Sequence, residues 1–217
     1  QIYSKFANEK KHYIEDQFNM IKDQIMLKAF DLFSQNGIKS VSMDDIAQTM
    51  GISKRTIYEF FSDKEELLCQ GIIFNYDRFK IQLAAFEKES ETILDAILYF
   101  YREIIKQPKC YNKKFYSDLK RYPRAMEIQE RYRNEFSFTC LQYFKRGVNE
   151  GIFVPEINFE IVALIAKKYI NMLEPSKSFS CHSVVEIYNT VLYTFLRGIS
   201  TEKGIKIVEQ YALNSHS

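Results

Sequence analysis

Residues 42–64, which read SMDDIAQTMGISKRTIYEFFSDK, constrain the fold of this chain more than any other stretch. In their first part the apolar residues recur at i, i+3, i+4 and i+7, as on one face of a helix: Met43, Ile46, Ala47 and Met50. Ser42 is a good N-cap for this helix, with Asp45 as its capping-box partner. Gly51 supplies the turn that follows, because glycine adopts positive φ without a steric cost. Ser53 then caps a second short segment, so the stretch predicts a helix-turn-helix.

The outward face of the second short helix carries side chains that suit DNA. Ile57 and Phe61 point inward at about 100° per residue, which leaves an exposed N-terminal face with Ser53, Lys54, Arg55, Thr56 and Tyr58. These groups donate to phosphate oxygens and to base edges in the major groove. An ordinary helical hairpin with a polar outer face would show the same periodicity, so the pattern alone leaves both interpretations open.

The order of residues in this motif is more specific than its periodicity. Residues 47–68 read A-x-x-x-G-I-S-K-R-T-I-Y-x-F-F-x-x-K-E-E-L-L, which resembles the DNA-binding half of TetR-type transcriptional regulators. The resemblance implies phosphate contacts from Ser42, Ser53, Tyr58 and Lys64, and base or groove contacts from Lys54, Arg55 and Thr56. Two positions depart from the family pattern. Glu59 stands where relatives often have His, and Phe60 stands where they often have Tyr. Phe60 therefore lacks a hydroxyl that could contact a phosphate.

Helical periodicity continues through the rest of the chain, and no strand alternation is seen. Helices are expected at residues 21–35, 62–88, 92–106, 112–121, 123–150, 158–173, 183–198 and 201–213. Ser62 and Glu65 form the capping signal S-x-x-E at the start of the expected helix at residues 62–88. With 217 residues, of which 46% are hydrophobic, the chain can bury a sizeable core. We therefore predict an all-α protein.

The expected domains follow from these segments and from the resemblance. Residues 1–19 form an N-terminal extension whose three basic and three acidic residues cancel, so no DNA role is expected for it. Residues 20–71 form a three-helix DNA-binding domain with the helix-turn-helix. Residues 72–217 form a helical effector-binding and dimerisation domain, joined to the first by a continuous helix that can transmit motion as a lever.

Charge leaves a second function open. Residues 20–71 contain six basic and eight acidic residues, against the basic footprint usual for a DNA-binding domain. The acidic balance and Glu59 favour the alternative, a helical dimeric ligand-binding or adaptor protein without specific DNA recognition. The gathering of cations at the presumed contact face favours DNA binding. A salt-dependent operator-binding assay separates the two.

Enzymatic, metal and membrane functions find little support in the sequence. The three histidines, His12, His182 and His216, have no ligand partner at i+3 or i+4, and no catalytic or phosphate-binding motif is present. Four widely spaced cysteines lack C-x-x-C pairing, and no apolar run reaches 18 residues. We expect a cytoplasmic protein with reduced thiols, no metal and no cofactor.

Aromatic residues are abundant, with 15 Tyr and 18 Phe but no Trp. TetR relatives hold a ligand among their central helices, so the resemblance implies a small, largely hydrophobic effector lined by Phe100, Tyr116, Phe136, Cys140 and Tyr143. Helix-spaced aromatics also fill ordinary cores, and that interpretation stays open. A basic cluster, Lys113, Lys114, Lys120, Arg121 and Arg124, suits either an anionic headgroup or a solvated face.

The two most apolar segments, residues 158–173 and 183–198, suit a homodimer interface. Their candidate contact residues are Ile161, Val162, Ile165, Tyr169, Leu173, Val184, Tyr188, Val191, Leu192 and Phe195. Both helices could instead fill the core of their own chain. The resemblance implies a four-helix interface, and a two-fold dimer would place two reading helices on a palindromic operator. A repressor released by its ligand is the expected function.

Overall fold

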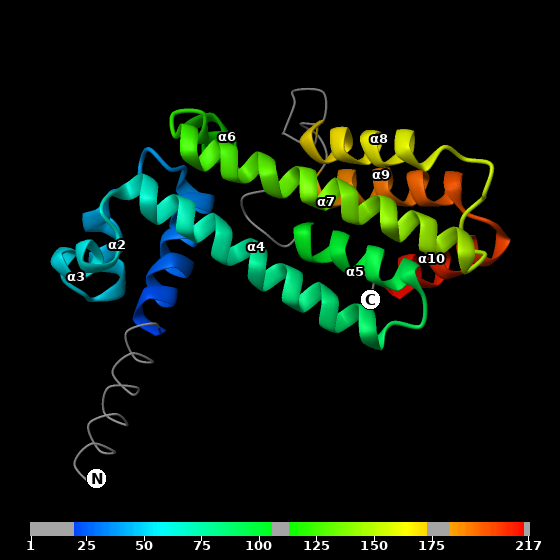
Figure 1. The fold of residues 1–217 in the computed structure, drawn as a ribbon, viewed down its shortest axis with the longest axis horizontal. Coiled ribbons are helices and arrows are strands. Elements are labelled where there is room, and N and C mark those ends of the chain that lie inside the picture. Colours follow the sequence, from blue (N-terminus) through cyan, green and yellow to red (C-terminus); the bar gives the residue numbers. More distant parts are fainter. Residues whose placement is uncertain (1–19, 106–112, 173–182, 215–217) are drawn as a thin grey trace, which may run out of the picture. The chain divides into compact units, whose positions relative to one another are not determined.

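The computed structural model describes residues 20–105, 113–172 and 183–214. The described helices are residues 20–36, α2 (Met43–Met50), α3 (Lys54–Phe60), α4 (Lys64–Glu89), α5 (Ile93–Ile105), α6 (Lys113–Leu119), α7 (Pro123–Asn149), α8 (Phe159–Met172), α9 (Val184–Ile199) and α10 (Glu202–Asn214). The all-α prediction is confirmed (Figure 1). The N-terminal extension and the three histidines lie outside the described residues.

The chain divides into two compact units. Unit 1 contains residues up to Asp77 together with Lys114–Ile128, and unit 2 contains Arg78–Lys113 together with the chain from Gln129 onward. The boundary falls inside α4 and again inside α7. Among the described residues, no helix combines the length and the apolar character needed to cross a membrane.

Local capping explains the two short helices of unit 1. The Asp45 amide donates to Ser42 Oγ at 3.1 Å, and the Asp45 carboxylate accepts from the Ser42 amide at 2.7 Å, which completes the predicted capping box of α2. Gly51 ends α2 at φ 67°, as predicted. The Thr56 amide donates to Ser53 Oγ at 3.0 Å, so Ser53 caps α3. These caps fix the tight connection between α2 and α3 that Figure 1 shows.

The cap of α4 differs from the predicted one by one residue. The Glu66 amide donates to Asp63 Oδ1 at 2.8 Å, and the Leu67 amide donates to the Asp63 carbonyl at 3.1 Å. Asp63 is therefore the N-cap, rather than Ser62. A carboxylate is a charged acceptor and suits the positive end of a helix better than a hydroxyl does.

The core of unit 1 is built from the inward faces of its helices. Its fully buried side chains include Ile25, Phe33, Ile38, Ile46, Ile57, Phe61, Leu67, Leu68 and Ile72. Phe115 of α6 joins this core, with its ring centroid 5.8 Å from that of Phe30. Gly37 ends the first helix at φ 88° and passes so close to α6 that an added Cβ would lie 2.8 Å from Lys114 Cβ. The turn after the first helix is thus packed directly on α6.

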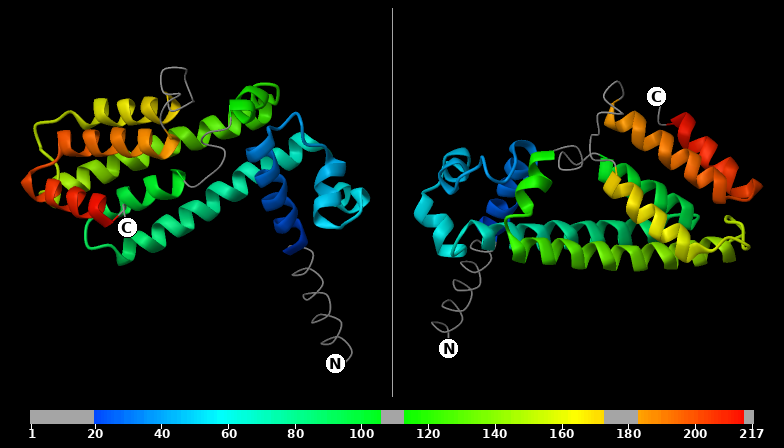
Figure 2. Two further views of the ribbon diagram at one scale, coloured as in Figure 1. Left: turned by 180° about the vertical axis from the view of Figure 1, so that it is seen from behind. Right: turned by 90° about the horizontal axis from the view of Figure 1, so that it is seen from above.

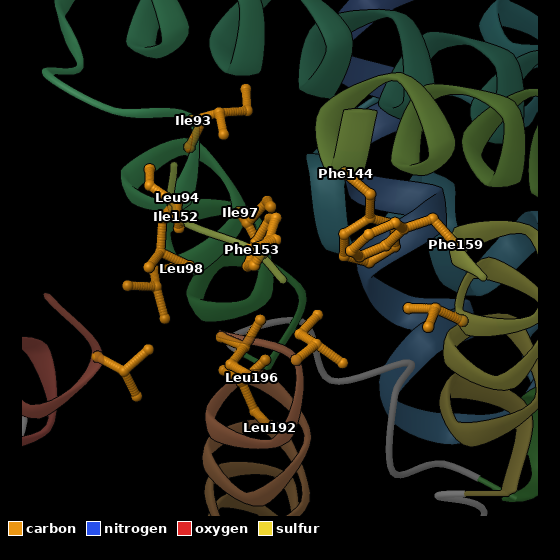
Figure 3. Close-up of a cluster of buried hydrophobic side chains, with 14 of the residues drawn as sticks. Ile93, Leu94, Ile97, Leu98, Phe144, Ile152, Phe153, Phe159, Leu192 and Leu196 are labelled. Carbon is orange, nitrogen blue, oxygen red and sulfur yellow. The ribbon is translucent and has the colours of Figure 1, made fainter. Parts of the chain in front are cut away.

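Unit 2 is a helical bundle with one continuous apolar core. Figure 3 shows side chains of α5, α7, α8 and α9 meeting there, among them Ile97, Phe144, Phe159 and Leu196. The Phe153 ring contacts the rings of Phe144 and Phe159 at centroid distances of 5.6 and 6.0 Å. An isolated antiparallel bridge between Phe153 and Ser200 holds the α7–α8 connection against the end of α9. It is not part of a sheet.

Within unit 2, the second half of α4 runs alongside α7, as both views in Figure 2 show. Ion pairs tie the two helices together. Lys80 pairs with Glu135 at 2.5 Å, and Arg146 pairs with Glu87 at 2.8 Å. The earlier residue of α4 pairs with the earlier residue of α7, and the later with the later, so the two helices run in the same direction.

Candidate nucleic-acid interface

Helix α3 presents its polar residues outward, as the periodicity predicts. Ile57 is fully buried beneath it, whereas Lys54, Arg55 and Tyr58 are exposed. The Arg55 side chain is 89% exposed, compared with 49% for Lys54. The structure therefore places the cations and the phenol of α3 on one accessible surface. That surface also includes the hydroxyls of Ser53 and Thr56, which lie 2.9 Å apart.

Ser42 and Ser53 serve their helices through the same hydroxyls that the resemblance assigns to phosphate. Ser42 Oγ donates to Asp45 Oδ2 at 2.7 Å, and hydrogen bonds from the Ser42 backbone and side chain lower the pKa of Asp45. Ser53 Oγ accepts from the Thr56 amide. Both serines remain exposed. Both are thus held in position at the surface by their capping roles.

Carboxylates accompany the two cations of α3. Lys54 Nζ lies 2.7 Å from Asp44 Oδ2 of α2, and this hydrogen bond raises the pKa of Lys54. Arg55 Nε lies 3.5 Å from Glu59 Oε1, one helical turn further on. The second pair follows from i,i+4 spacing. The first could not be predicted from the sequence, because only the crossing of α2 and α3 brings residues ten positions apart together.

The Lys64 side chain already has partners within unit 1. Its ammonium donates to the Ile38 carbonyl and lies 5.5 Å from the centroid of the Phe33 ring. Burial lowers the pKa of Lys64, against the opposing effect of the Asp118 and Asp45 carboxylates. Lys64 thus binds the loop after the first helix from the first turn of α4.

The predicted effector residues fall into both units. Phe100, Phe136, Cys140 and Tyr143 belong to unit 2, whereas Tyr116 lies on α6 in unit 1, with its ring 5.4 Å from that of Phe115. The rings of Phe100 and Phe136 stack at 4.1 Å with an angle of 11° between their planes. These two side chains therefore form one aromatic layer between α5 and α7.

Cys140 and Tyr143 add polar atoms next to that layer. Burial raises the pKa of the Cys140 thiol to about 12. Burial also raises the pKa of Tyr143, whose hydroxyl donates to Glu87 Oε2 at 2.9 Å. Glu87 also begins a chain of ionic contacts that was not predicted from the sequence. Arg146 bridges Glu87 and Glu150, and Glu150 accepts from the Ile93 amide at 2.9 Å. Only the pair Arg146–Glu150 has a sequence signal, the i,i+4 spacing.

The candidate interface residues of α8 and α9 separate into exposed and buried sets. Ile161 and Ile165 are exposed, whereas Val162, Tyr188 and Leu192 are buried in the core of their own chain. Val191 and Phe195 are half-buried. The side chains of Tyr169, Leu173 and Val184 lie outside the described part of the structure. Two further apolar residues that the sequence analysis did not name are exposed, Leu164 and Val185.

The predicted basic cluster lies largely on unit 1. Lys114, Lys120, Arg121 and Arg124 are exposed, and the Lys113 side chain lies outside the described part. Arg124 Nη2 lies 2.7 Å from Glu66 Oε2, and the Arg124 amide donates to Glu65 at 3.1 Å. The start of α7 is thereby attached to the first turn of α4. At Arg124 the cluster is part of an ion pair rather than a free anion site.

Sequence comparison places the helix-turn-helix in a known group. Residues 25–70 match the family described as bacterial regulatory proteins, tetR family. A curated relative is the negative transcriptional regulator IcaR of the icaADBC biofilm operon from Staphylococcus aureus, 29% identical over 85 residues. That match covers 39% of this chain and 46% of IcaR, so it spans about half the length of this relative.

Solved structures share the fold over most of the chain. A TetR-family regulator from Agrobacterium tumefaciens superposes with a TM-score of 0.69 at 18% identity, covering 85% of this chain and 100% of that one. A regulator from Saccharomonospora viridis in complex with choline gives a TM-score of 0.70 at 15% identity, with the same coverage of both chains. Residues 25–70 therefore carry the helix-turn-helix of the tetR family of bacterial regulatory proteins, and the chain shares its fold with solved regulators of that family.

Proposed function

We propose that this chain is a repressor that binds a palindromic DNA operator as a homodimer and is released by a small, largely hydrophobic ligand. The observation that supports DNA binding best is the surface of α3, where Lys54, Arg55 and Tyr58 stand exposed above the buried Ile57. A rigid short helix with donors at its N-terminal end suits the major groove. The negative regulation in IcaR's name supports repression rather than activation.

In this proposal the side chains divide into positioning and reading groups. Ser42, Ser53, Tyr58 and Lys64 would contact phosphates, which fix the register but carry no sequence information. Lys54, Arg55 and Thr56 would face the bases or groove walls. Arg55 is the strongest reader, because a bidentate contact to guanine contributes about 1–3 kcal/mol of discrimination. Arg55→Ala should relax sequence preference without abolishing binding to arbitrary DNA.

Exposed apolar residues of α8 and α9 support the homodimer. Ile161, Leu164 and Ile165 are 54%, 59% and 39% exposed on one face of α8, and Val185 of α9 is 49% exposed. Large apolar side chains that are exposed at i, i+3 and i+4 favour an interface with a second copy. Two such helices from each copy would form a four-helix contact. The proposed interface centres on these four residues, because Val162, Tyr188 and Leu192 already fill their own core.

The aromatic layer of unit 2 supports a hydrophobic effector. Phe100 and Phe136 offer apolar faces, and Cys140 and Tyr143 lie on the same helix as Phe136. A ligand that separates the stacked rings would move α5 relative to α7. Such a ligand releases DNA only if its affinity differs between the two arrangements, and the usual coupling is about 1–3 kcal/mol. Tyr116 belongs to unit 1, where its ring packs against that of Phe115.

A selection experiment tests the DNA-binding function and requires no assumption about the operator sequence. The full chain is incubated with a pool of random duplexes, and bound DNA is amplified and sequenced over several rounds. We expect a palindrome to emerge, with half-sites about 34–36 Å apart. The logarithm of the association constant for that duplex, measured by fluorescence anisotropy, should fall linearly with the logarithm of the salt concentration. Enrichment of no motif together with the absence of a salt slope would instead favour the adaptor function.

A second experiment tests the effector site with a hydrophobic dye as the probe. Anilinonaphthalene sulfonate should fluoresce on binding to the parent protein, and Cys140→Phe should reduce that signal, because the larger side chain would compete with the dye for the aromatic layer. Operator affinity in Cys140→Phe should match that of the parent. Undiminished dye binding in this variant would place the apolar cavity elsewhere.

A further inference from the structure

Both cations that α3 offers to DNA are held by carboxylates of the same protein surface. Asp44 of α2 holds Lys54 at 2.7 Å, and Glu59 of α3 lies 3.5 Å from Arg55. The two carboxylate side chains are 65% and 51% exposed, so they stand on the accessible face. The predicted DNA-binding face is therefore not simply basic. It consists of two cation–carboxylate pairs side by side.

The two ion pairs weaken binding to DNA that offers only phosphate contacts. A phosphate that approaches Lys54 or Arg55 must displace a carboxylate that already neutralises it, and the displaced carboxylate stays nearby and repels the phosphate. Exposed ion pairs contribute little to stability, so a better partner can break them. The negative balance of residues 20–71 adds to the same effect. Non-specific affinity, which depends almost entirely on phosphate contacts, is thus penalised more than specific affinity.

A matching base pair can compensate for breaking these ion pairs, whereas a phosphate alone cannot. Guanine O6 and N7 accept a bidentate contact from Arg55, while the freed Glu59 can accept from the amino group of cytosine. Arg55 and Glu59 then both have hydrogen-bond partners on the DNA. Glu59 already lies beside the Arg55 guanidinium, one helical turn further on, before DNA arrives.

We propose that Asp44 and Glu59 increase specificity: they compete with phosphates for Lys54 and Arg55, so that DNA with the matching base edges displaces them more readily than phosphates alone do. This inference rests on the proposed DNA-binding function. It assigns to two acidic residues the suppression of binding to arbitrary sequence. Removal of either carboxylate should therefore strengthen binding to the wrong DNA more than binding to the right DNA.

The test compares Asp44→Asn and Glu59→Gln with a control of equal charge change. Asp31→Asn is a suitable control, because Asp31 is exposed on the first helix and not on α3. Each protein is titrated with the selected palindrome and with a scrambled duplex of the same composition, at several salt concentrations. Circular dichroism checks that each variant is folded.

We expect both variants to bind the scrambled duplex roughly three- to tenfold more tightly than Asp31→Asn does, with a log–log salt slope steeper by about 0.9 for each phosphate gained. The ratio of specific to non-specific affinity should fall, and Glu59→Gln should alter the preferred base. Variants that match Asp31→Asn on both duplexes, while the parent protein still prefers the palindrome, would overturn the inference alone. A parent protein that binds neither duplex would overturn the proposed function as well.

Discussion

The Asp118 carboxylate accepts a hydrogen bond of 2.7 Å from the Lys39 backbone amide, 79 residues earlier in the chain. It therefore joins α6 to the turn that follows the first helix, within unit 1. The same turn passes so close to α6 at Gly37 that no side chain fits between them. A charged acceptor on a backbone amide is a stronger bond than a neutral one. This contact holds the 37–40 turn in place beside the helix-turn-helix.

We expect Asp118→Ala to free the Lys39 amide. Loss of a hydrogen bond to a charged group near the surface should cost about 1 kcal/mol of local stability, which corresponds to roughly a fivefold faster amide exchange. Hydrogen exchange followed by NMR measures the Lys39 amide directly. Asp31→Ala, which removes another exposed carboxylate of unit 1, should leave that amide unchanged. Equal protection of Lys39 in all three proteins would show that the bond does not hold the turn.

Two buried glycines in helices should respond in opposite ways to alanine. A Cβ on Gly147 of α7 would overlap the ring of Phe153, whereas a Cβ on Gly71 of α4 would meet the Met26 carbonyl at an ordinary 3.7 Å. Gly147→Ala should lower the free energy of unfolding by about 1–3 kcal/mol through overpacking. Gly71→Ala should be neutral or stabilising by up to about 1 kcal/mol, because alanine favours the helix. Thermal unfolding of both variants measures the contrast.

Charge placed on the exposed face of α8 should separate the proposed dimer. Ile165→Glu would bury a carboxylate at the interface without a partner, so light scattering should give the mass of one chain at micromolar concentration. Ile81→Glu is the matched control, because Ile81 of α4 is 70% exposed but is not on α8 or α9. The control should keep the mass of two chains. A parent protein that is itself monomeric would contradict the proposed interface.

Much of the fold follows from local rules that the sequence displays. Ser42, Gly51 and Ser53 act within three or four residues, so their caps and turn could be predicted one by one. The predicted cap of α4 is wrong by one residue because Ser62 and Asp63 are both good caps, and only the carboxylate makes the bond. Local spacing alone left the choice between these neighbours open.

What the sequence could not supply are contacts between distant segments. The ion pairs Lys54–Asp44 and Arg124–Glu66 depend on how helices cross, and no periodicity encodes a crossing. The apolar face of α8 shows the same limit. Ile161 and Val162 are adjacent apolar residues, yet one is exposed and the other buried, because the core lies on one side only.

Alkaline pH should weaken unit 2 through Cys140. Burial raises the pKa of this thiol from its ordinary value of 9.0 to about 12 in the folded state. Well below pH 9 the thiol is protonated in both states, and its contribution to stability is fully present. Above that value the unfolded chain loses the proton and the folded chain does not, so stability falls until the pH passes the folded pKa.

At about pH 10 this effect should amount to about 1.4 kcal/mol. Urea unfolding at about pH 8 and at about pH 10 measures it, at one protein concentration. Tyr101 and Tyr143 also have raised pKa values, so the parent protein shows a combined loss. Cys140→Ala isolates the thiol, because its stability should fall less between the two pH values. If parent and variant lose equal stability, the thiol does not carry the effect.

The last prediction concerns Lys64, a half-buried cation that could both stabilise unit 1 and contact DNA. Its ammonium donates to the Ile38 carbonyl and lies over the Phe33 ring, and its aliphatic stem is half-buried. An ammonium has three donors, so one bond to Ile38 leaves others for a phosphate. Lys64→Met keeps most of the stem but removes all donors, and Lys64→Ala removes both. Comparing the two variants therefore separates packing from hydrogen bonding.

If Lys64 contacts a phosphate, both variants should weaken the palindrome and the scrambled duplex alike and lower the log–log salt slope by about 0.9 for one lost phosphate contact. Lys64→Ala should also unfold at a lower temperature than Lys64→Met, by the loss of stem packing. An unchanged salt slope in Lys64→Met, together with reduced thermal stability, would show that the ammonium belongs to the fold alone. Phosphate contacts would then come from Ser53 and Tyr58, which stand exposed on the reading surface.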